Sequence, residues 1–398
     1  MSNDSKYLQR GVSATKEDVH AAIKNLDKGI FPNAFCKIFP DYLGGDETFC
    51  NISHGDGTGT KASLAYIYWK ETGDISIWKN LIVDNIVMNL DDMICAGAID
   101  NFLYTSLINR NKTFIPGEVI AALIDGADSF FARMKNYGIN IHYMGGETAD
   151  LGDCVRTITV DASMACRMKR SDVIETNIQN GNVLVGFASF GKAIYEDEYN
   201  AGMGSNGLTA ARHDVLSHEY ATKYPESFNH SIDEKLVYSG TKKLTDELWC
   251  GGTPTTDGVN LSVGKAMLSP TRTFAPVMKE IFESHRKKIN GIIHCTGGGQ
   301  GKVLNFIEDL HVIKNNLFAT PPLFKLIQTE SKTAWSEMYR VFNMGNRMEI
   351  YTDEKTASEL ISIAQKFSVD AQIIGHVEKS SSKKVTLQTE NGEFVYAK

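Results

Sequence analysis

The chain has 398 residues, of which 42% are hydrophobic and 22% are charged, and its formal net charge is −7. A chain of this length predicts two domains, because a single hydrophobic core seldom grows so large. The acidic balance, and the lack of a basic run with interleaved aromatic residues, argue against nucleic acid as the main partner. No apolar run approaches the roughly 18–20 residues of a membrane span, so no membrane contact is expected.

The seven cysteines are scattered, with neither a C-x-x-C pair nor the spacing of a zinc site. The start of the chain also lacks the pattern of a signal peptide. We therefore expect a cytoplasmic protein with reduced thiols, in which each cysteine serves as a small buried apolar residue.

The first half of the chain alternates between strand and helix patterns. Residues 1–48 are polar and weakly patterned, and residues 49–52 predict a strand that leads into a glycine-rich stretch. After this stretch, the spacing of apolar residues and of turn residues predicts helices over 78–98 and 116–136, and strands over 102–108, 139–144 and 155–168.

The polar stretch 169–182 predicts a boundary between an N-terminal domain, residues 1–170, and a C-terminal domain, residues 171–398. The second half restarts with an apolar strand over 183–189. It continues with predicted helices near 206–219, 234–248, 271–288 and 354–367, strands near 291–295, 346–351 and 371–377, and a closing hairpin of strands 385–389 and 394–397. Helices and strands interleave in both halves, so the predicted fold class is α/β or α+β, with two domains.

The stretch HGDGTGTK, residues 54–61, places one carboxylate and one lysine in a run of bare backbone. Its three glycines let the chain pass close to a ligand and point N–H groups at it. Asp56 is a candidate ligand for magnesium, and Lys61 could neutralise a phosphate as a compact charge. The stretch does not fit a Walker A loop, and a glycine-rich hairpin turn with a solvated aspartate is the alternative.

Three carboxylates lie on the helix predicted over 78–98. Asp84 and Asp91 are seven residues apart and share a face, whereas Asp92 lies one step round the helix. The helix therefore presents a group of acids beside an otherwise apolar surface. The alternative is a solvated helix face.

Three further stretches combine glycines with polar groups near the ends of predicted elements. In YMGGETAD, residues 143–150, Glu147 follows a strand end and could supply another metal oxygen, with a simple turn as the alternative. In MGSNGLTAAR, residues 203–212, a first helical turn offers an anion site or a plain N-cap. In IIHCTGGGQGK, residues 292–302, the three glycines indicate close approach of a ligand, and His294 before them is more often structural than catalytic. Together the stretches predict a magnesium–nucleotide site and a second phosphate site.

The order of these stretches resembles the aminoimidazole ribonucleotide synthetase (phosphoribosylformylglycinamidine cyclo-ligase) family. HGDGTGTK is similar to the HGDGVGTK of that family, and GGETA at 145–149 matches its next signature. Later blocks follow in the same order: SNG at 205–207, LSPTR at 268–272, HCTGGG at 294–299 and EMYRVFNMGNRMEI at 337–350. The last two are similar to HITGGG and to an EM-RTFN-G-GM pattern. The resemblance spans roughly residues 49–377.

The resemblance implies two α/β domains, a homodimer formed through the N-terminal sheets, and an ATP-dependent ligase. The implied reaction closes formylglycinamidine ribonucleotide into 5-aminoimidazole ribonucleotide and releases ADP and phosphate, as a step of purine biosynthesis. The implied cofactors are ATP and Mg²⁺, with a monovalent cation as a further candidate. The partners are then a small ribonucleotide, ATP and a second copy of the chain.

The resemblance also implies roles for individual residues. Magnesium would be held by Asp56, Asp92 and Glu147. Further ATP-binding residues would be Gly57, Thr58, Gly59, Thr60, Lys61, Asp84, Gly145 and Gly146. The ribonucleotide would be held by Ser205, Asn206, Gly207, Thr296, Gly297, Gly298 and Gly299. Lys61 and His294 would be the catalytic candidates, His294 as an acid–base or orienting group.

The chain departs from the family pattern at several places. The Asn-Asp pair of the family aligns with Asp91 and Asp92, and helical geometry places Asp91 in line with Asp84, so which of the two binds metal is open. The residues after GGETA, 150–153, and the N-terminal segment also differ. The alternative functions are phosphorylation of another small molecule by a divergent member, and nucleotide binding without turnover.

Overall fold

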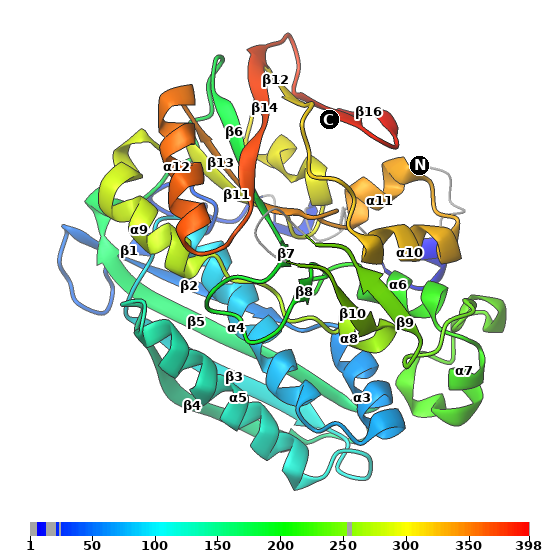
Figure 1. The fold of residues 1–398 in the computed structure, drawn as a ribbon. Coiled ribbons are helices and arrows are strands. Elements are labelled where there is room, and N and C mark those ends of the chain that lie inside the picture. Colours follow the sequence, from blue (N-terminus) through cyan, green and yellow to red (C-terminus); the bar gives the residue numbers. More distant parts are fainter. Residues whose placement is uncertain (1–5, 13–20, 24, 253–256, 398) are drawn as a thin grey trace.

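The structure is a computed structural model that describes residues 6–12, 21–23, 25–252 and 257–397. Two large sheets organise it, one in each half of the chain, which confirms the predicted mixture of strands and helices. Figure 1 shows the N-terminal sheet with its helices below the C-terminal sheet. The predicted boundary at 170/171 falls between the last strand of the first sheet and the first strand of the second.

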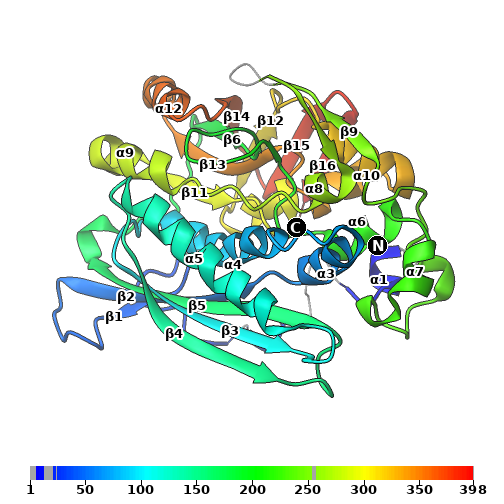
Figure 2. The same ribbon diagram turned by 60° about the horizontal axis from the view of Figure 1, so that its bottom comes forward.

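The N-terminal sheet has five strands in the order β1-β2-β5-β3-β4, and only the β3–β4 pair is parallel. The strands are β1 (Ile38–Pro40), β2 (Phe49–Gly57), β3 (Phe102–Arg110), β4 (Ile141–Asp150) and β5 (Ile158–Lys169). Alternate residues of β5 are buried, as its sequence predicts. Helices α3 (Lys61–Thr72), α4 (Ile77–Cys95) and α5 (Gly117–Lys135) cover one face of this sheet (Figure 2). No helix of the described residues covers the other face, which we call the bare face.

Helix α4 is the structural centre of the molecule. It contacts β2 and β5 on one side and β11 and α9 of the C-terminal half on the other. This position explains why almost every residue of α4 is buried, including its three aspartates. Although α4 has 19 residues, none of the helices in the described ranges is both long and apolar enough to span a lipid bilayer.

The C-terminal sheet has seven strands in the order β11-β13-β6-β14-β12-β15-β16. They are β6 (Val183–Ala188), β11 (Gly291–His294), β12 (Leu310–Lys314), β13 (Asn346–Thr352), β14 (Ala371–Lys379), β15 (Lys384–Thr389) and β16 (Gly392–Ala397). Its helices are α6 (Leu208–Val215), α7 (Glu219–Lys223), α8 (Val263–Met267), α9 (Ala275–His285), α10 (Pro322–Ser331), α11 (Trp335–Val341) and α12 (Glu354–Lys366). A short hairpin, β9 (Glu247–Cys250) with β10 (Val259–Ser262), and the pair β7 (Phe190–Gly191) and β8 (Asn200–Ala201) complete this half, while α1 (Lys6–Gln9) packs on α6.

Two predicted helices of the second half are wrong in part. The helix predicted over 234–248 is a single 3₁₀ turn, after which the chain runs as a bridge beside the end of α6 and enters β9. The helix predicted over 271–288 begins only at Ala275, because Thr271, Thr273 and Phe274 donate hydrogen bonds to the aspartates of α4. In both cases a tertiary contact overrides the local preference.

Candidate active site

The acids of α4 face the C-terminal half at two different places. Asp84 and Asp91 both bind the loop 269–274, which contains the LSPTR block, whereas Asp92 binds His294 at the end of β11. This agrees with the helical geometry, which predicts that Asp84 and Asp91 share a face and that Asp92 lies one step round.

Asp84 is the centre of a buried hydrogen-bond cluster. Its Oδ1 accepts from Lys61 Nζ at 2.7 Å, from Ser205 Oγ at 3.1 Å, and from the backbone N–H and hydroxyl of Thr271 at 2.8 and 2.6 Å. Lys61 Nζ donates a second bond to the carbonyl of Ser269 at 2.6 Å. Lys61 is fully buried, so in this conformation its ammonium joins the two halves of the chain and does not reach a phosphate in solvent.

Asp91 is held by the same loop. Its two oxygens accept from Thr273 Oγ1 at 2.6 Å and from the N–H of Phe274 at 3.0 Å. Burial raises the pKa of Asp91 to about 7, although both of these hydrogen bonds oppose the shift. Asp91 is 0% exposed whereas Asp92 is 7% exposed, which makes Asp91 the poorer candidate for a metal.

Asp92 lies among cations and histidines. Its Oδ1 is 2.6 Å from His294 Nδ1, and its Oδ2 is 3.4 Å from His54 Nε2. Burial would raise the pKa of Asp92, but the charge of Lys302 and the contact with His294 lower it overall. Burial also lowers the pKa of His294, with the nearby charge of Arg347 acting in the same direction. The geometry therefore fits an ionised Asp92 beside a neutral His294 whose Nδ1–H it accepts.

Asp56 lies on the same side of the sheet as Asp92. It is the last residue but one of β2 and lies next to α4. The side-chain amide of Asn89 donates to the Asp56 carbonyl at 3.3 Å, and Asn89 Oδ1 is 3.1 Å from His54 Nδ1. The Asp56 carboxylate accepts from the N–H of Gly57 at 2.7 Å. Two of the three predicted magnesium ligands thus belong to the β2–α4 contact.

Glu147, the third predicted ligand, lies elsewhere in the single chain. In the sheet, Glu147 of β4 pairs with Leu107 of β3, and Leu107 pairs with Asp161 of β5. Asp161 in turn pairs with Gly57 of β2. Three spacings between neighbouring strands, each about 4.8 Å, therefore separate Glu147 from β2. Leu107 is 43% exposed on the face that the helices leave bare, and Glu147 is exposed beside it. A bulge between Tyr104 and Ser106 sets this register. Across the described residues of one chain, no three His, Cys, Asp or Glu side chains are grouped to hold a metal.

The glycines of the predicted loops have identifiable structural reasons. Gly57 faces Asp161, whose Oδ1 would lie 1.9 Å from an added Cβ. Gly299 has φ +51°, and an added Cβ would lie 2.4 Å from the carbonyl oxygen of Tyr339. The HCTGGG glycines predict the close approach of a ligand. At Gly299, however, it is the chain's own backbone that lies close, whereas Gly297 faces open space.

The predicted substrate loops meet the acids of α4 from the C-terminal side. Ser205 reaches Asp84, and Thr60 Oγ1 is 2.8 Å from the hydroxyl of Thr209 just after the SNG block. Thr296 accepts a hydrogen bond from Lys302, whose ammonium also lies over the ring of Phe35. The structure thus brings the 57–61, 205–207 and 296–299 stretches to one interdomain region around α4.

Sequence reasoning missed three groups at this region: His54, Lys302 and Arg347. His54 belongs to the HGDGTGTK stretch and could have been considered, because it precedes the candidate metal ligand by two residues. Lys302 could also have been considered, because it lies three residues after the triple glycine. Arg347 belongs to the last matched block and has no local signal, since its position depends on the strand register.

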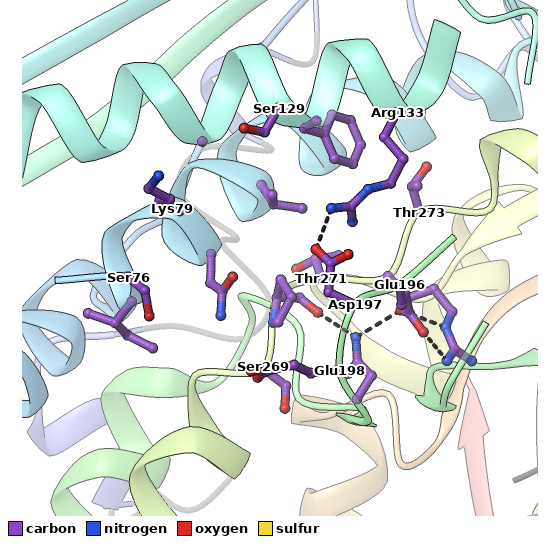
Figure 3. A pocket seen from close by; sticks show the side chains of 18 of the residues that line it. Ser76, Lys79, Ser129, Arg133, Glu196, Asp197, Glu198, Ser269, Thr271 and Thr273 are labelled. Carbon is purple, nitrogen blue, oxygen red and sulfur yellow. Dashed lines mark hydrogen bonds and ion pairs between the residues drawn. The ribbon is translucent and has the colours of Figure 1, made fainter. Parts of the chain in front are cut away.

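A separate cavity of about 360 Å³ lies between α4, α5 and the loops 195–200 and 269–273. Figure 3 shows Ser129 and Arg133 side by side on α5, with Arg133 pointing towards Asp197, and Lys79 on α4. None of the predicted site residues lines this cavity. It lies on the other side of the loop that binds Asp84 and Asp91, since Thr271 and Thr273 border both.

Comparison with known proteins gives a consistent result. Residues 179–388 match the family model described as "AIR synthase related protein, C-terminal domain". A protein named phosphoribosylformylglycinamidine cyclo-ligase from Methanococcus vannielii is 28% identical over 327 residues, which cover 81% of this chain and 76% of the relative.

Among solved structures, Thermotoga maritima PurL complexed with FGAR has a TM-score of 0.53 at 13% identity and matches 97% of this chain. The same protein complexed with ATP has a TM-score of 0.51 at 14% identity, again over 97% of this chain. The chain spans about half the length of PurL, 50% and 48% in the two complexes, and at these identities the likeness is one of fold.

Proposed function

The chain belongs to the family of AIR synthase related proteins, and on this premise we propose that it uses ATP to close formylglycinamidine ribonucleotide into 5-aminoimidazole ribonucleotide. The relative is named phosphoribosylformylglycinamidine cyclo-ligase, and the PurL structures of the same fold were solved with ATP and with FGAR. We place the reaction in purine biosynthesis. The observation that carries the proposal is the convergence of the α4 acids with the 205–207 and 296–299 loops between the two halves of the chain.

The proposed reaction has two stages. The formyl oxygen of the substrate attacks the γ-phosphorus of ATP, so that an O–P bond forms, the bond to the β-phosphate oxygen breaks, and ADP leaves with its electron pair. An amidine nitrogen then attacks the activated carbon, loses a proton, and expels inorganic phosphate as the ring closes. Such transfers depend on alignment and charge neutralisation more than on a covalent catalyst.

The residues fit a magnesium–ATP complex. We assign Asp56 and Asp92 to magnesium, because this ion is commonly bound by one or two carboxylates together with substrate phosphates. Bound there, the ion would neutralise charge on the phosphates. The backbone of 57–60 would cradle the phosphates, and His294, held by Asp92, would orient the reacting end or accept its proton.

Lys61 keeps its predicted role at the ATP phosphates only if the Asp84 cluster opens when nucleotide binds. Its ammonium is within hydrogen-bond reach of Asp84 and Ser269 in this conformation. A closed cluster would make Lys61 a residue that joins the domains.

The proposal includes a homodimer formed through the bare face of the N-terminal sheet. Leu103, Leu107 and Met144 are 38%, 43% and 59% exposed on or beside that face, which is an unusual place for large apolar side chains. A second copy packed there would cover them and could bring Glu147 to the magnesium site of its partner. Leu107→Glu is expected to give a monomer in light scattering, and a dimer that survives this change would contradict the assigned face.

The function is tested by a coupled assay. Purified protein with ATP, Mg²⁺ and formylglycinamidine ribonucleotide is expected to form ADP and aminoimidazole ribonucleotide in equal amounts. Asp56→Asn should reduce turnover at least about 100-fold, whereas the control Asp125→Asn on the exposed side of α5 should not. ADP release that is independent of the ribonucleotide would support phosphorylation of another molecule, and binding of ATP without turnover would support a non-catalytic paralogue.

A further inference from the structure

Arg347 is an arginine buried between the two halves of the chain. It is 1% exposed and is the second residue of β13. The pairing of β13 with β6 shifts between Asn346 and Met348, so Arg347 is the extra residue of a bulge. Bulges re-aim side chains, and this one directs the guanidinium towards α4, where Arg347 Nη2 lies 3.2 Å from Met88 Sδ.

The guanidinium has few partners for a buried cation. A methionine sulfur is a weak acceptor, and Arg347 Nε has no hydrogen-bond partner. Asp91, Asp84 and Asp92 attract its charge, but Arg347 forms no direct ion pair within the described ranges. By contrast, the buried Arg272 binds Glu196 through two nitrogens. A buried donor without a partner is costly, so a reason for it is needed.

Other buried polar atoms without partners belong to segments that lie near Arg347 in the described part of the chain. Asp84 Oδ2, Asn206 Oδ1 and His294 Nε2 are also buried without hydrogen-bond partners. They belong to α4, the 205–207 loop and the end of β11, and the charge of Arg347 acts on both Asp84 and His294. The site therefore offers one N–H donor, from Arg347, and two acceptor oxygens, from Asp84 and Asn206, together with the Nε2 ring nitrogen of His294. A ligand that fits these atoms has both a hydrogen-bond acceptor and a hydrogen-bond donor. An amide, with its oxygen beside an N–H, is such a group.

The loop before the SNG block is shaped around the guanidinium. Gly204 has φ +70°, and an added Cβ would lie 2.0 Å from Arg347 Nη1. Gly202 and Gly207 also have positive φ, a conformation that glycine adopts without strain. Because Arg347 is 1% exposed, a ligand reaches it only after the segments around it move.

We propose that Arg347 is a catalytic residue that contacts the formyl amide of the substrate and neutralises the charge that develops on its oxygen. This inference rests on the proposed function and adds the group that faces the reacting end. The amide oxygen gives up electron density when it attacks the γ-phosphorus, and it takes the electron pair of the C–O bond when it leaves as part of inorganic phosphate. The fixed guanidinium therefore acts mainly in the second stage, where it stabilises the negative charge on the departing oxygen. Asp84 Oδ2 accepts from the amide N–H and orients it.

The test compares Arg347→Lys and Arg347→Met with Arg212→Met. Arg212 is a matched control, because it is also buried with an unpartnered Nε, but it donates to the Ser227 carbonyl and the Tyr238 hydroxyl away from α4. Each variant is assayed for kcat, for KM of ATP and of the ribonucleotide, and for thermal unfolding.

We expect kcat to fall at least about 100-fold in Arg347→Met with KM for ATP unchanged, because a charge-stabilising donor acts mainly in the transition state. Arg347→Lys should retain part of the activity, and added ethylguanidinium should partly restore Arg347→Ala. Arg212→Met should lower the unfolding temperature and leave kcat within about threefold.

The outcomes separate the two proposals. A wild-type protein that does not convert the ribonucleotide would remove the proposed function and this inference together. A wild-type protein that does, alongside a folded Arg347→Met variant with normal kcat, would remove only the inference. If Arg347→Met does not fold, Arg347→Lys decides: a folded lysine variant with unchanged kcat and unchanged KM would show that the guanidinium serves structure alone.

Discussion

Lys314 and Arg347 are both fully buried cations of the C-terminal half, yet their surroundings differ. The Lys314 ammonium binds the Glu349 carboxylate and the backbone and side-chain oxygens of Gln300, and Glu349 also accepts from Asn346 and Tyr351. Within the described residues, the guanidinium of Arg347 hydrogen-bonds only the sulfur of Met88. The comparison teaches that a buried charge with all its partners in the protein holds the fold, whereas one without them points to a missing ligand.

The saturated cluster has a clear structural task. Gln300 follows the triple glycine, and its side-chain amide donates to the carbonyls of Asn343 and Asn346. Lys314 and Glu349 therefore fix the 296–299 loop against the 343–346 loop. The same rigidity supports the proposed substrate site without touching the substrate.

The largest expected effect is on Lys314. Lys314→Met leaves the Glu349 carboxylate buried without its cation, and breaking such a pair typically costs about 3–5 kcal/mol. Chemical denaturation should show a loss of this size in the free energy of unfolding. The double variant Lys314→Met/Glu349→Leu should recover part of it, and a single variant as stable as the wild type would contradict the assigned role.

Lys61 is an intermediate case between Lys314, which has all its partners in the protein, and Arg347, which lacks them. It pairs with Asp84 inside the proposed site, so Lys61→Met should destabilise the protein by about 3 kcal/mol, slightly less than Lys314→Met because Asp84 keeps its bonds from Ser205 and Thr271. Activity should fall as well if the ammonium also reaches ATP. Loss of stability with unchanged KM for ATP and unchanged kcat in the folded fraction would restrict Lys61 to joining the domains.

His213 extends the comparison to a neutral buried group. Its Nδ1 accepts from the N–H of Tyr238 at 3.2 Å, and burial, followed by the charges of Arg212 and Arg10, lowers its pKa to about 2. The unfolded chain therefore binds one more proton than the native protein between about pH 2 and 6.5, so stability is present above pH 6.5 and is lost as the pH falls. The slope from this group is up to about 1.4 kcal/mol per pH unit.

His213→Asn removes this titration while keeping an acceptor near the Nδ1 position. We expect its free energy of unfolding to vary less steeply between pH 6 and 4.5 than that of the wild type, as measured by urea denaturation at each pH. Parallel curves for the two proteins would show that His213 is not the group that responds.

The smallest effect is expected at the rim of the cavity in Figure 3. Arg133 pairs with Asp197, but the Asp197 side chain is 78% exposed, so solvent screens the interaction. Arg133→Gln should change the free energy of unfolding by less than about 1 kcal/mol. A larger loss would show that exposed pairs support this interface as much as buried ones do.

Much of the architecture could be predicted from the chain because it depends on local periodicity. The helix over 78–98 follows from apolar residues that recur every three or four positions, and β5 follows from strict alternation. The same helical geometry placed Asp84 and Asp91 on one face and Asp92 beside it, as the contacts with loop 269–274 and His294 show.

The partners of these side chains could not be predicted in the same way. The prediction that Glu147 follows a strand end is wrong, because Glu147 lies inside β4, where the order of strands and a bulge place it on the bare face of the sheet. The sequence predicts that Lys61 binds phosphate. In the structure it donates to Asp84, because α3 and α4 lie side by side. Residues 271–274 lose their predicted helix to carboxylates that are distant in sequence.

The sequence by itself determined most of the element types, the mixed α and β class of the fold and the glycine–acid stretches, since short-range spacing and backbone freedom decide these features. Only the tertiary structure decided which charges are neutralised and which remain without partners. That outcome depends on strand register and on contacts between residues such as Met88 and Arg347, which lie far apart along the chain.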